Sequence, residues 1–152
     1  MDRRHFLMGA AAAGAASRLF AAPSDTVRVG VIGIGGRGKD HIGGFSKLPN
    51  VKVVAVADID DSHLKSAAAQ VEKLTQSAPK QYPDFRKMLE DKEIDAVSIA
   101  TPNHWHTLMT IWACQAGKDV YVEKPATHNM FESRKVVEAA RKYKRMVQVG
   151  SQ

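Results

Sequence analysis

The sequence has few of the features that place a protein in a special structural class. Cys114 is the single cysteine among 152 residues, so no disulfide can form within the chain. It lies in an apolar helical stretch, which predicts a buried and unreactive thiol. The apolar run at residues 6–16 is too short to cross a bilayer, because a membrane-spanning helix needs about 20 such residues. With 44% hydrophobic and 25% charged residues, the chain is expected to form an ordinary globular domain.

Aromatic residues are also scarce, and their scarcity bears on the basic charge of the chain. The formal net charge is +6, while Phe, Trp and Tyr together make up 7% of the residues. Residues 131–145 alone carry a net +4, on a predicted helix whose carboxyl end favours cations. No aromatic side chains alternate with these basic residues, so the charge does not indicate a nucleic-acid partner.

The first residues have the pattern of an export signal. Arg3 and Arg4 precede the apolar run, and small residues follow it. The opening letters MDRRHFL resemble the R-R-x-F-L core of twin-arginine signals, although Asp2 and Met8 stand where Ser or Thr and Lys are common. Arg18, beyond the apolar run, also fits that route. We expect residues 1–24 to be a twin-arginine signal peptide and residues 25–152 to be one domain that is periplasmic or otherwise exported.

The assignment of a twin-arginine signal leads to an expectation for the rest of the chain. Twin-arginine export carries proteins that are already folded, and it suits proteins that take up a cofactor in the cytoplasm. Cleavage is expected between residues 17 and 24, with an uncleaved membrane tether as the alternative. The mature part should therefore contain a cofactor site and no membrane span.

Short apolar runs alternate with helical patterns from residue 26 onward. The runs predict strands at 27–32, 51–57, 96–100, 120–122 and 146–149, with a weak strand near 81–82. Helical patterns occupy 37–47, 61–76, 84–90, 104–116 and 130–144. Continuous apolar strands are typical of a parallel sheet that is covered on both faces. We predict an α/β fold: a Rossmann-type doubly wound parallel sheet of about six strands with helices on both faces.

Two helices carry more specific predictions. The fourth places its large apolar side chains at the spacing of one helix face, namely Trp105, Leu108, Met109, Trp112 and Ala116. This spacing predicts that the two tryptophans belong to the core and not to a cofactor platform. The last helix is preceded by Asn129, with Glu132 three residues later, which predicts a capping box.

A glycine-rich turn follows the first predicted strand. It reads Gly33-Ile34-Gly35-Gly36-Arg37-Gly38. This is the G-x-G-x-x-G pattern, in which the glycines allow a tight turn, an approach of the backbone to a pyrophosphate, and close helix–strand packing. The following helix offers free N–H groups and the positive end of its dipole to the phosphates. The pattern predicts a dinucleotide site formed by these six residues.

The carboxylate that this site needs is Asp58, at the end of the second predicted strand. It lies 20 residues beyond Gly38, where a carboxylate accepts hydrogen bonds from the adenosine ribose hydroxyls. A negative charge there would repel a 2′-phosphate, so NAD is favoured over NADP, with Arg37 close enough to weaken that preference. The alternative is that Asp58 only caps a turn with Asp60 and Asp61.

The same letters permit a second interpretation. Residues 33–39 also match G-x-x-x-x-G-K, the start of a phosphate-binding loop for nucleoside triphosphates. That motif needs Ser or Thr at the next position to hold Mg²⁺, and this chain has Asp40 there. A carboxylate beside the phosphates is unfavourable, so the dinucleotide interpretation is preferred.

Two further motifs follow the fourth and fifth predicted strands. Residues 100–106 read ATPNHWH, and residues 123–125 read EKP. Together with the glycine loop and Asp58, they resemble the A-T-P-x-x-x-H and E-K-P signatures of the glucose–fructose oxidoreductase and inositol dehydrogenase family (Gfo/Idh/MocA). The resemblance covers residues 26–152. It implies a nicotinamide-binding N-terminal domain and a larger C-terminal α/β domain that binds a sugar or cyclitol and builds the oligomer. We expect that second domain to be missing from this chain.

The resemblance also implies roles for single residues. Lys124 is the expected catalytic group, a polariser or proton relay, because an ammonium can hold a substrate hydroxyl and stabilise a developing alkoxide. Glu123 and Pro125 are expected to shape the turn that presents it, and a lysine that merely pairs with Glu123 in solvent is the alternative. The nicotinamide side is expected to be lined by Thr101, Pro102, Asn103 and His106, with Asn103 equally able to cap the next helix. No metal site is expected from His104 and His106, which point apart at a spacing of two on a helix.

Three functions remain open on these residues. The first is an exported NAD-dependent oxidoreductase that acts on a sugar or polyol and is represented here by its cofactor domain, which alone is expected to be inactive. The second is a glycoside hydrolase of the same fold that uses bound NAD transiently. The third is a non-catalytic NAD-binding module that works with another chain. The histidine that often serves as base in the family would lie in the absent domain.

Overall fold

A computed structural model of the chain describes residues 26–151. The predicted signal peptide, residues 1–24, lies outside the described residues. Between residues 26 and 151, no helix has both the length and the apolar character that crossing a membrane requires.

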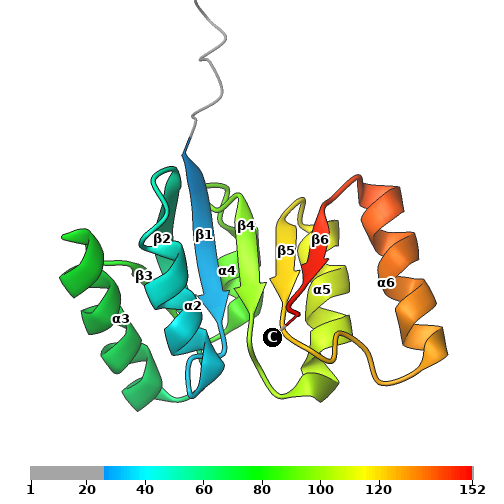
Figure 1. The fold of residues 1–152 in the computed structure, drawn as a ribbon, viewed down its shortest axis with the longest axis horizontal. Helices are drawn as coiled ribbons and strands as arrows, with labels where there is room; N and C mark the ends of the chain where they lie inside the picture. The colour runs from blue at the N-terminus through cyan, green and yellow to red at the C-terminus, as the bar shows by residue number, and fades with distance from the viewer. Residues whose placement is uncertain (1–25, 152) are drawn as a thin grey trace, which may run out of the picture.

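The described residues form one parallel sheet of six strands. In chain order the strands are β1 (Val27–Ile32), β2 (Val51–Ala57), β3 (Lys80–Tyr82), β4 (Ala96–Ile99), β5 (Asp119–Val122) and β6 (Val147–Val149). Their order across the sheet is β3-β2-β1-β4-β5-β6, and every neighbouring pair is parallel. All strand arrows therefore point the same way, so that the loops after the strands gather at one edge (Figure 1). The predicted doubly wound sheet is confirmed.

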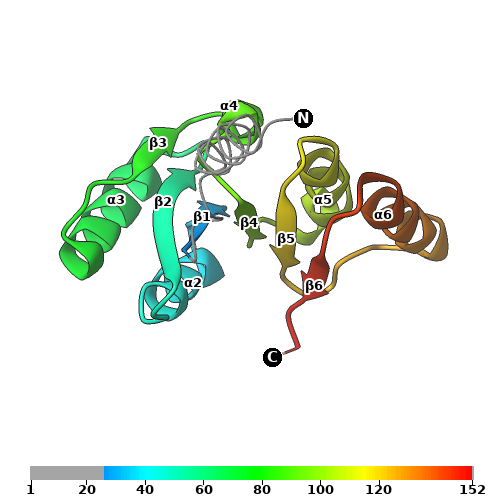
Figure 2. The same ribbon diagram turned by 90° about the horizontal axis from the view of Figure 1, so that it is seen from above.

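Helices cover both faces of the sheet. They are α2 (Arg37–Phe45), α3 (Asp61–Thr75), α4 (Phe85–Glu90), α5 (His106–Gln115), preceded by the 3₁₀ turn η1 (Asn103–Trp105), and α6 (Met130–Tyr143). One apolar cluster joins α2 and α3 to β1 and β2 through residues such as Ile42, Leu64 and Val31. The other joins α4, α5 and α6 to the opposite face, with Met88 and Ile99 fully buried. Figure 2 shows the two helical layers on either side of the sheet.

Side-chain caps fix where three of the helices begin. Asp60 accepts hydrogen bonds from two backbone N–H groups at the start of α3, and Asp84 does the same for one N–H of α4. Asn129 accepts from the Glu132 N–H at 3.0 Å, as predicted for the last helix. The Glu132 carboxylate reaches back to the N–H of His128, at 2.7 Å, one residue further than in the usual capping box. These bonds satisfy N–H groups that have no partner within the helix.

The prediction that both tryptophans belong to the core is wrong for Trp105 and holds in part for Trp112, which packs against the core cluster. Trp105 is 40% exposed and belongs to η1, while Trp112 is only partly buried. The buried side of α5 is instead formed by His106, Thr107, Met109, Thr110, Ala113 and Cys114. The reason is that α5 is apolar around most of its circumference, so spacing alone did not identify the face that packs on the sheet. Cys114 is fully buried, as expected, and burial raises the pKa of its thiol.

Candidate functional site

The glycine loop joins β1 to α2 at the carboxyl edge of the sheet. Gly33 has φ of +83°, and a Cβ at this position would lie 2.7 Å from the backbone nitrogen of Thr101. A Cβ at Gly38 would collide with the carbonyl oxygen of Gly33. Both positions therefore require glycine, the first because of its backbone conformation and its approach to the loop after β4, the second because the helix packs against the turn.

The amino end of α2 is open toward this edge. Unlike α3, α4 and α6, it has no side-chain cap, and a Cβ on its N-cap residue, Gly36, would meet nothing within 4 Å. The first N–H groups of a helix need acceptors, and a phosphate supplies them. The uncapped helix with free space at Gly36 therefore fits the pyrophosphate of a dinucleotide.

Gly35 differs from the expectation for the second glycine of the motif. A Cβ here would lie 2.7 Å from Cε1 of His63, on the first turn of α3. The space beside Gly35 is thus filled by an imidazole ring from the next helix. Sequence reasoning missed His63, which carries no motif of its own.

Asp58 follows β2 and is held by two backbone donors. Its Oδ2 accepts from the Ile34 N–H at 2.7 Å, and its Oδ1 accepts from the Asp60 N–H at 3.0 Å. The first bond joins the carboxylate to the glycine loop. The second is the turn contact considered as the alternative, so Asp58 contacts the glycine loop as well as capping the turn. With its side chain only 11% exposed and its orientation fixed, this carboxylate fits the role of acceptor for ribose hydroxyls.

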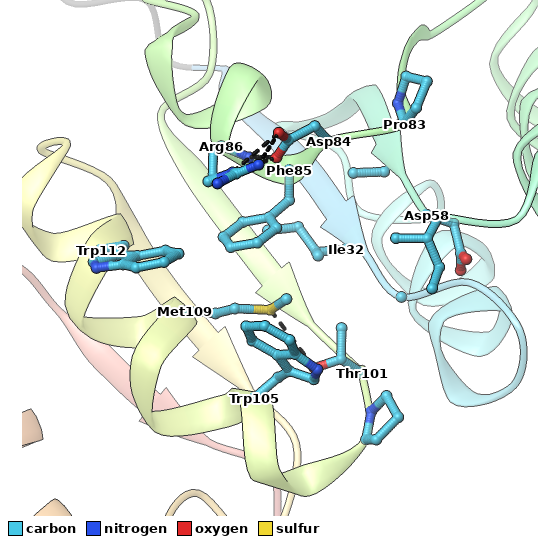
Figure 3. Close-up of a pocket in the computed structure, with 14 residues that line it drawn as sticks. Ile32, Asp58, Pro83, Asp84, Phe85, Arg86, Thr101, Trp105, Met109 and Trp112 are labelled. Carbon is cyan, nitrogen blue, oxygen red and sulfur yellow. Dashed lines mark hydrogen bonds and ion pairs between the residues drawn. The ribbon is translucent and has the colours of Figure 1, made fainter.

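A cavity of about 520 Å³ opens beside Asp58 and Gly33. We call it the aromatic cavity, because its far wall carries Phe85, Trp105 and Trp112. Figure 3 shows these rings facing Asp58 across the cavity. The rings of Phe85 and Trp112 stack with centroids 5.8 Å apart. Volume and lining are typical of a small-molecule site, and the position of Trp105 after β4 is a signal that the helix-face argument overlooked.

Most of the residues predicted for the nicotinamide side meet around a second cavity of about 540 Å³. We call it the Lys124 cavity. It is lined by Arg37, Ala100, Thr101, Asn103, His106, Glu123, Lys124 and Pro125. Thr101 borders both cavities, whereas Pro102 lines the aromatic cavity alone. The loops after β1, β4 and β5 thus bring both groups of predicted residues to one edge of the sheet.

Glu123 is the most connected side chain of the Lys124 cavity. Its Oε1 accepts from Nε of Arg37 at 3.3 Å and lies 3.0 Å from Nε2 of His41, and its Oε2 accepts from the Lys124 N–H at 3.1 Å. Burial acts to raise the pKa of Glu123, but the hydrogen bonds from His41, Lys124 and Arg37 outweigh it and hold the pKa below its ordinary value. Glu123 is therefore a buried anion that holds the backbone of the Lys124 loop.

Arg37 does not take the position considered for it beside a 2′-phosphate. Its guanidinium binds Glu123 and also Asp40, at 3.0 Å. Arg37 and Glu123 both line the Lys124 cavity. Arg37 therefore does not offset the charge of Asp58.

His41 is a second residue that sequence reasoning missed. It is 7% exposed, and its Nδ1 lies 2.7 Å from Oγ of the fully buried Ser98 while Nε2 faces Glu123. This chain of contacts links α2 to β4 and to the loop after β5. The available signal was spacing, since Gly38, His41 and Ile42 are the buried residues of α2.

His106 ties two of the loops together. It is 2% exposed, with Nε2 2.8 Å from the Thr101 carbonyl oxygen and Nδ1 2.8 Å from the Pro125 carbonyl oxygen. Its ring nitrogens are thereby occupied, and no cluster of three or more potential metal ligands occurs between residues 26 and 151. Asn103 does not cap the following helix, because neither η1 nor α5 has a side-chain cap.

Lys124 itself is exposed at the mouth of its cavity. Its backbone N–H bonds Glu123, but among the described residues its ammonium group forms no ion pair, with Glu123 or with any other carboxylate. The alternative of a lysine paired with Glu123 is therefore not what the structure shows. The ammonium is available to a ligand.

Comparison with known proteins agrees with this geometry. The sequence model of the Gfo/Idh/MocA family, described as an oxidoreductase family with an NAD-binding Rossmann fold, matches residues 27–151. The uncharacterized oxidoreductase YrbE of Bacillus subtilis is 36% identical over 123 residues, which are 80% of this chain and 34% of that protein. A glycosyl hydrolase family 109 protein of Saccharopolyspora erythraea is 35% identical over 125 residues, 80% of this chain and 27% of that protein.

Solved structures show the same relationship. An NAD-binding oxidoreductase from Klebsiella pneumoniae superposes with a TM-score of 0.72 at 32% identity, covering 82% of this chain and 34% of the other. Scyllo-inositol dehydrogenase from Lactobacillus casei, with NAD(H) and scyllo-inositol bound, gives 0.75 at 25% identity, covering 82% of this chain and 36% of the other. The chain spans about a third of the length of the relatives it matches. It belongs to the Gfo/Idh/MocA oxidoreductase family and contains that family's NAD-binding Rossmann domain.

Proposed function

We propose that the chain is the cofactor-binding domain of an exported oxidoreductase that transfers a hydride between NAD and a hydroxyl-bearing carbon of a sugar or polyol. The observation that carries this proposal is the ammonium of Lys124, which pairs with no carboxylate among residues 26–151 and lies at the mouth of the Lys124 cavity. Neighbouring proteins that act on inositols supply the substrate class.

The residues of this chain divide the work between binding and polarisation. The open end of α2 binds the pyrophosphate, and Asp58 accepts from the adenosine ribose. NAD, when bound, supplies the hydride acceptor. Lys124 donates a hydrogen bond to the substrate hydroxyl oxygen and stabilises the negative charge that develops there as the proton passes to a base, the histidine expected in the family's second domain. Glu123 and His106 hold the loop that positions Lys124.

Cofactor preference is part of the proposal. Asp58 lies where a 2′-phosphate of NADP would be placed against its negative charge, and Arg37 is engaged elsewhere. We therefore expect NAD to bind more tightly than NADP.

The decisive experiment begins with the coding DNA beyond the codon for Gln152. The complete product of that frame is assayed for NADH formation with inositols and other polyols. Lys124→Ala is expected to reduce turnover by at least about a hundredfold while NAD⁺ affinity stays within twofold. Equal turnover of the variant and the wild type would contradict the role of Lys124.

A glycoside hydrolase that uses NAD transiently is the second candidate. It is favoured by several curated relatives of 34–37% identity that are named glycosyl hydrolase family 109 proteins. Such an enzyme would oxidise the sugar, eliminate the aglycone and reduce the product again. Release of an aglycone without net formation of NADH would identify it, whereas net NADH from a polyol identifies the dehydrogenase.

A non-catalytic NAD-binding module is the third candidate. It predicts that the chain binds NAD⁺ but acts only in association with another chain. Reduction of NAD⁺ by polyols in the absence of any partner would exclude this candidate.

A further inference from the structure

His63 contacts both the glycine loop and Asp58, the two parts of the proposed dinucleotide site that lie next to α3. It is the third residue of α3, and its backbone N–H donates to Oδ1 of Asp60 at 3.2 Å. Its Nδ1 lies 3.6 Å from Oδ1 of Asp58, and its ring lies against Gly35 of the glycine loop. The side chain is 38% exposed, so the imidazole is accessible while it contacts both elements.

Other cations near this site are committed to other carboxylates. Arg37 binds Glu123 and Asp40. Arg86, on the wall of the aromatic cavity, is held by both carboxylate oxygens of Asp84 at 2.6–3.0 Å. Among the described residues, His63 is thus the side chain capable of positive charge that forms an ion-pair contact with Asp58.

We propose that His63 determines how strongly the site discriminates between NAD and NADP. This inference rests on the proposed binding of a dinucleotide with its ribose at Asp58. A 2′-phosphate brought to Asp58 meets a fixed negative charge, which the neighbouring Asp60 reinforces. The imidazole beside Asp58 offers a donor to that phosphate and, when protonated, a compensating charge; charge-assisted hydrogen bonds of this kind are the strong ones.

The ribose diol of NAD needs no such compensation. Asp58 accepts its hydroxyls whether or not a cation is adjacent, so a change at His63 is expected to act mainly on NADP. His63→Gln keeps a hydrogen-bond donor and removes the possibility of charge, whereas His63→Arg makes the charge permanent. The two substitutions should therefore move the affinity ratio in opposite directions.

The test measures dissociation constants of NAD⁺ and NADP⁺ for the chain by calorimetry. We expect His63→Gln to weaken NADP⁺ by roughly fivefold to tenfold and His63→Arg to tighten it by roughly tenfold, with NAD⁺ changed by less than about threefold. Lys65→Gln is the matched control: it removes an exposed cation from the same helix and should leave the ratio of the two constants unchanged.

Each outcome has a definite consequence. A ratio that stays within about twofold of the wild type in both His63 variants overturns the inference, while NAD⁺ binding by the wild type leaves the proposed function intact. If NADP⁺ binding by the wild type is too weak to measure, a gain in His63→Arg still supports the inference and its absence overturns it. If the wild type binds neither nucleotide, both the proposed function and the inference fail.

Discussion

Glu123 shows what a single buried charge does at the edge of this sheet. Its two oxygens face Arg37, His41 and the Lys124 N–H, so the anion joins α2 to the loop after β5, two segments that are far apart in the chain. Removing one partner of a buried, charged hydrogen bond is costly because the remaining groups lose their compensation. The position of the Lys124 loop therefore depends on a charge that never has to contact substrate.

Glu123→Gln should weaken the dependence of stability on pH. The pKa of Glu123 is lowered in the folded state, so its charged form stabilises the fold at pH values above its pKa in the unfolded chain, which is near 4.5. This contribution is lost as the pH falls through the pKa of the folded state. At pH 7 we expect the free energy of unfolding to drop by about 1–3 kcal/mol in the variant. Between pH 5 and pH 3, the wild type should lose more stability than the variant.

Urea unfolding at a series of pH values measures both effects. Glu138→Gln provides the control. Glu138 is an exposed partner of Lys135 on α6, so its substitution should change the free energy of unfolding only slightly. If Glu123→Gln and Glu138→Gln follow the same pH dependence, the buried anion is not a source of stability.

Residues of the site were predictable where a motif carried them. The glycine loop, Asp58 and the loops after β4 and β5 were recognised because each follows directly on a strand of a parallel sheet. His41 and His63 were not, because each comes from a helix and acquires its partner only when the helix packs: His41 on Ser98 and Glu123, His63 on Gly35 and Asp58. Tertiary placement of this kind leaves no local pattern in the sequence.

At the scale of elements, α2 combines two features that favour an anion. It has no side-chain cap, and its N-cap residue Gly36 faces free space. A pyrophosphate would provide the missing acceptors at this end. We therefore expect a negative charge at position 36 to weaken the binding of NAD⁺.

Gly36→Asp and Gly36→Asn test this with nearly identical side chains. Both can cap α2, but Asp places a negative charge where the phosphates bind. We expect the NAD⁺ dissociation constant of the Asp variant to exceed that of the Asn variant by roughly tenfold, measured by calorimetry at low ionic strength. Equal constants would show that the phosphates do not bind at this end of α2.

The end of α6 offers a prediction on stability alone. Lys144 follows the helix with φ of +53°, a left-handed conformation that costs a residue with a Cβ about 1 kcal/mol. Lys144→Gly should therefore raise the free energy of unfolding by about 0.5–1 kcal/mol. Lys142→Gly, within the last turn of the same helix, should lower it by about 1 kcal/mol.

Thermal or urea unfolding of the two variants decides the matter. Both remove one lysine and add one glycine, so their effects on net charge and composition are identical. If both variants lower the free energy of unfolding, the left-handed conformation of Lys144 does not destabilise the wild type.

Strand positions were predicted to within about one residue, because strands buried on both faces are continuous apolar runs. The direction in which α5 packs was not. Its sequence is apolar around most of the helix, and the 3₁₀ turn at its start changes the phase, so Trp105 lines the aromatic cavity and does not lie in the core. Where a helix is apolar on several faces, only its contacts determine which one is buried.

At the scale of the whole molecule, the topology was predictable and the reaction was not. Strand–helix alternation fixed a parallel sheet whose loops converge at one edge, and this edge holds both cavities. The chain spans about a third of the length of its relatives, and the residues it contains do not identify a substrate. The proposed sugar or polyol therefore rests on relatives and on the chemistry of Lys124.

Export is a property that the folded domain alone does not carry. We propose that residues 1–24 direct the chain into the twin-arginine route, on the basis of Arg3 and Arg4 and the apolar run that follows. Fused to a reporter that folds before export, these residues should deliver it to the periplasm of a bacterium. Replacing both arginines by lysine should retain the reporter inside the cell.

Fractionation of the cells with an activity assay for the reporter provides the measurement. A strain that lacks the twin-arginine translocase is the control and should behave like the double-lysine variant. Export that persists in either case would contradict this route.

The central claim is that the carboxyl edge of this sheet binds NAD. Calorimetric titration of NAD⁺ into the purified chain measures it most directly. We predict saturable binding of one NAD⁺ per chain, with a dissociation constant in the micromolar to low millimolar range, about −4 to −8 kcal/mol. A titration that shows no saturable binding of NAD⁺ up to about 10 mM, with a chain whose circular dichroism shows the α/β fold, would contradict the account.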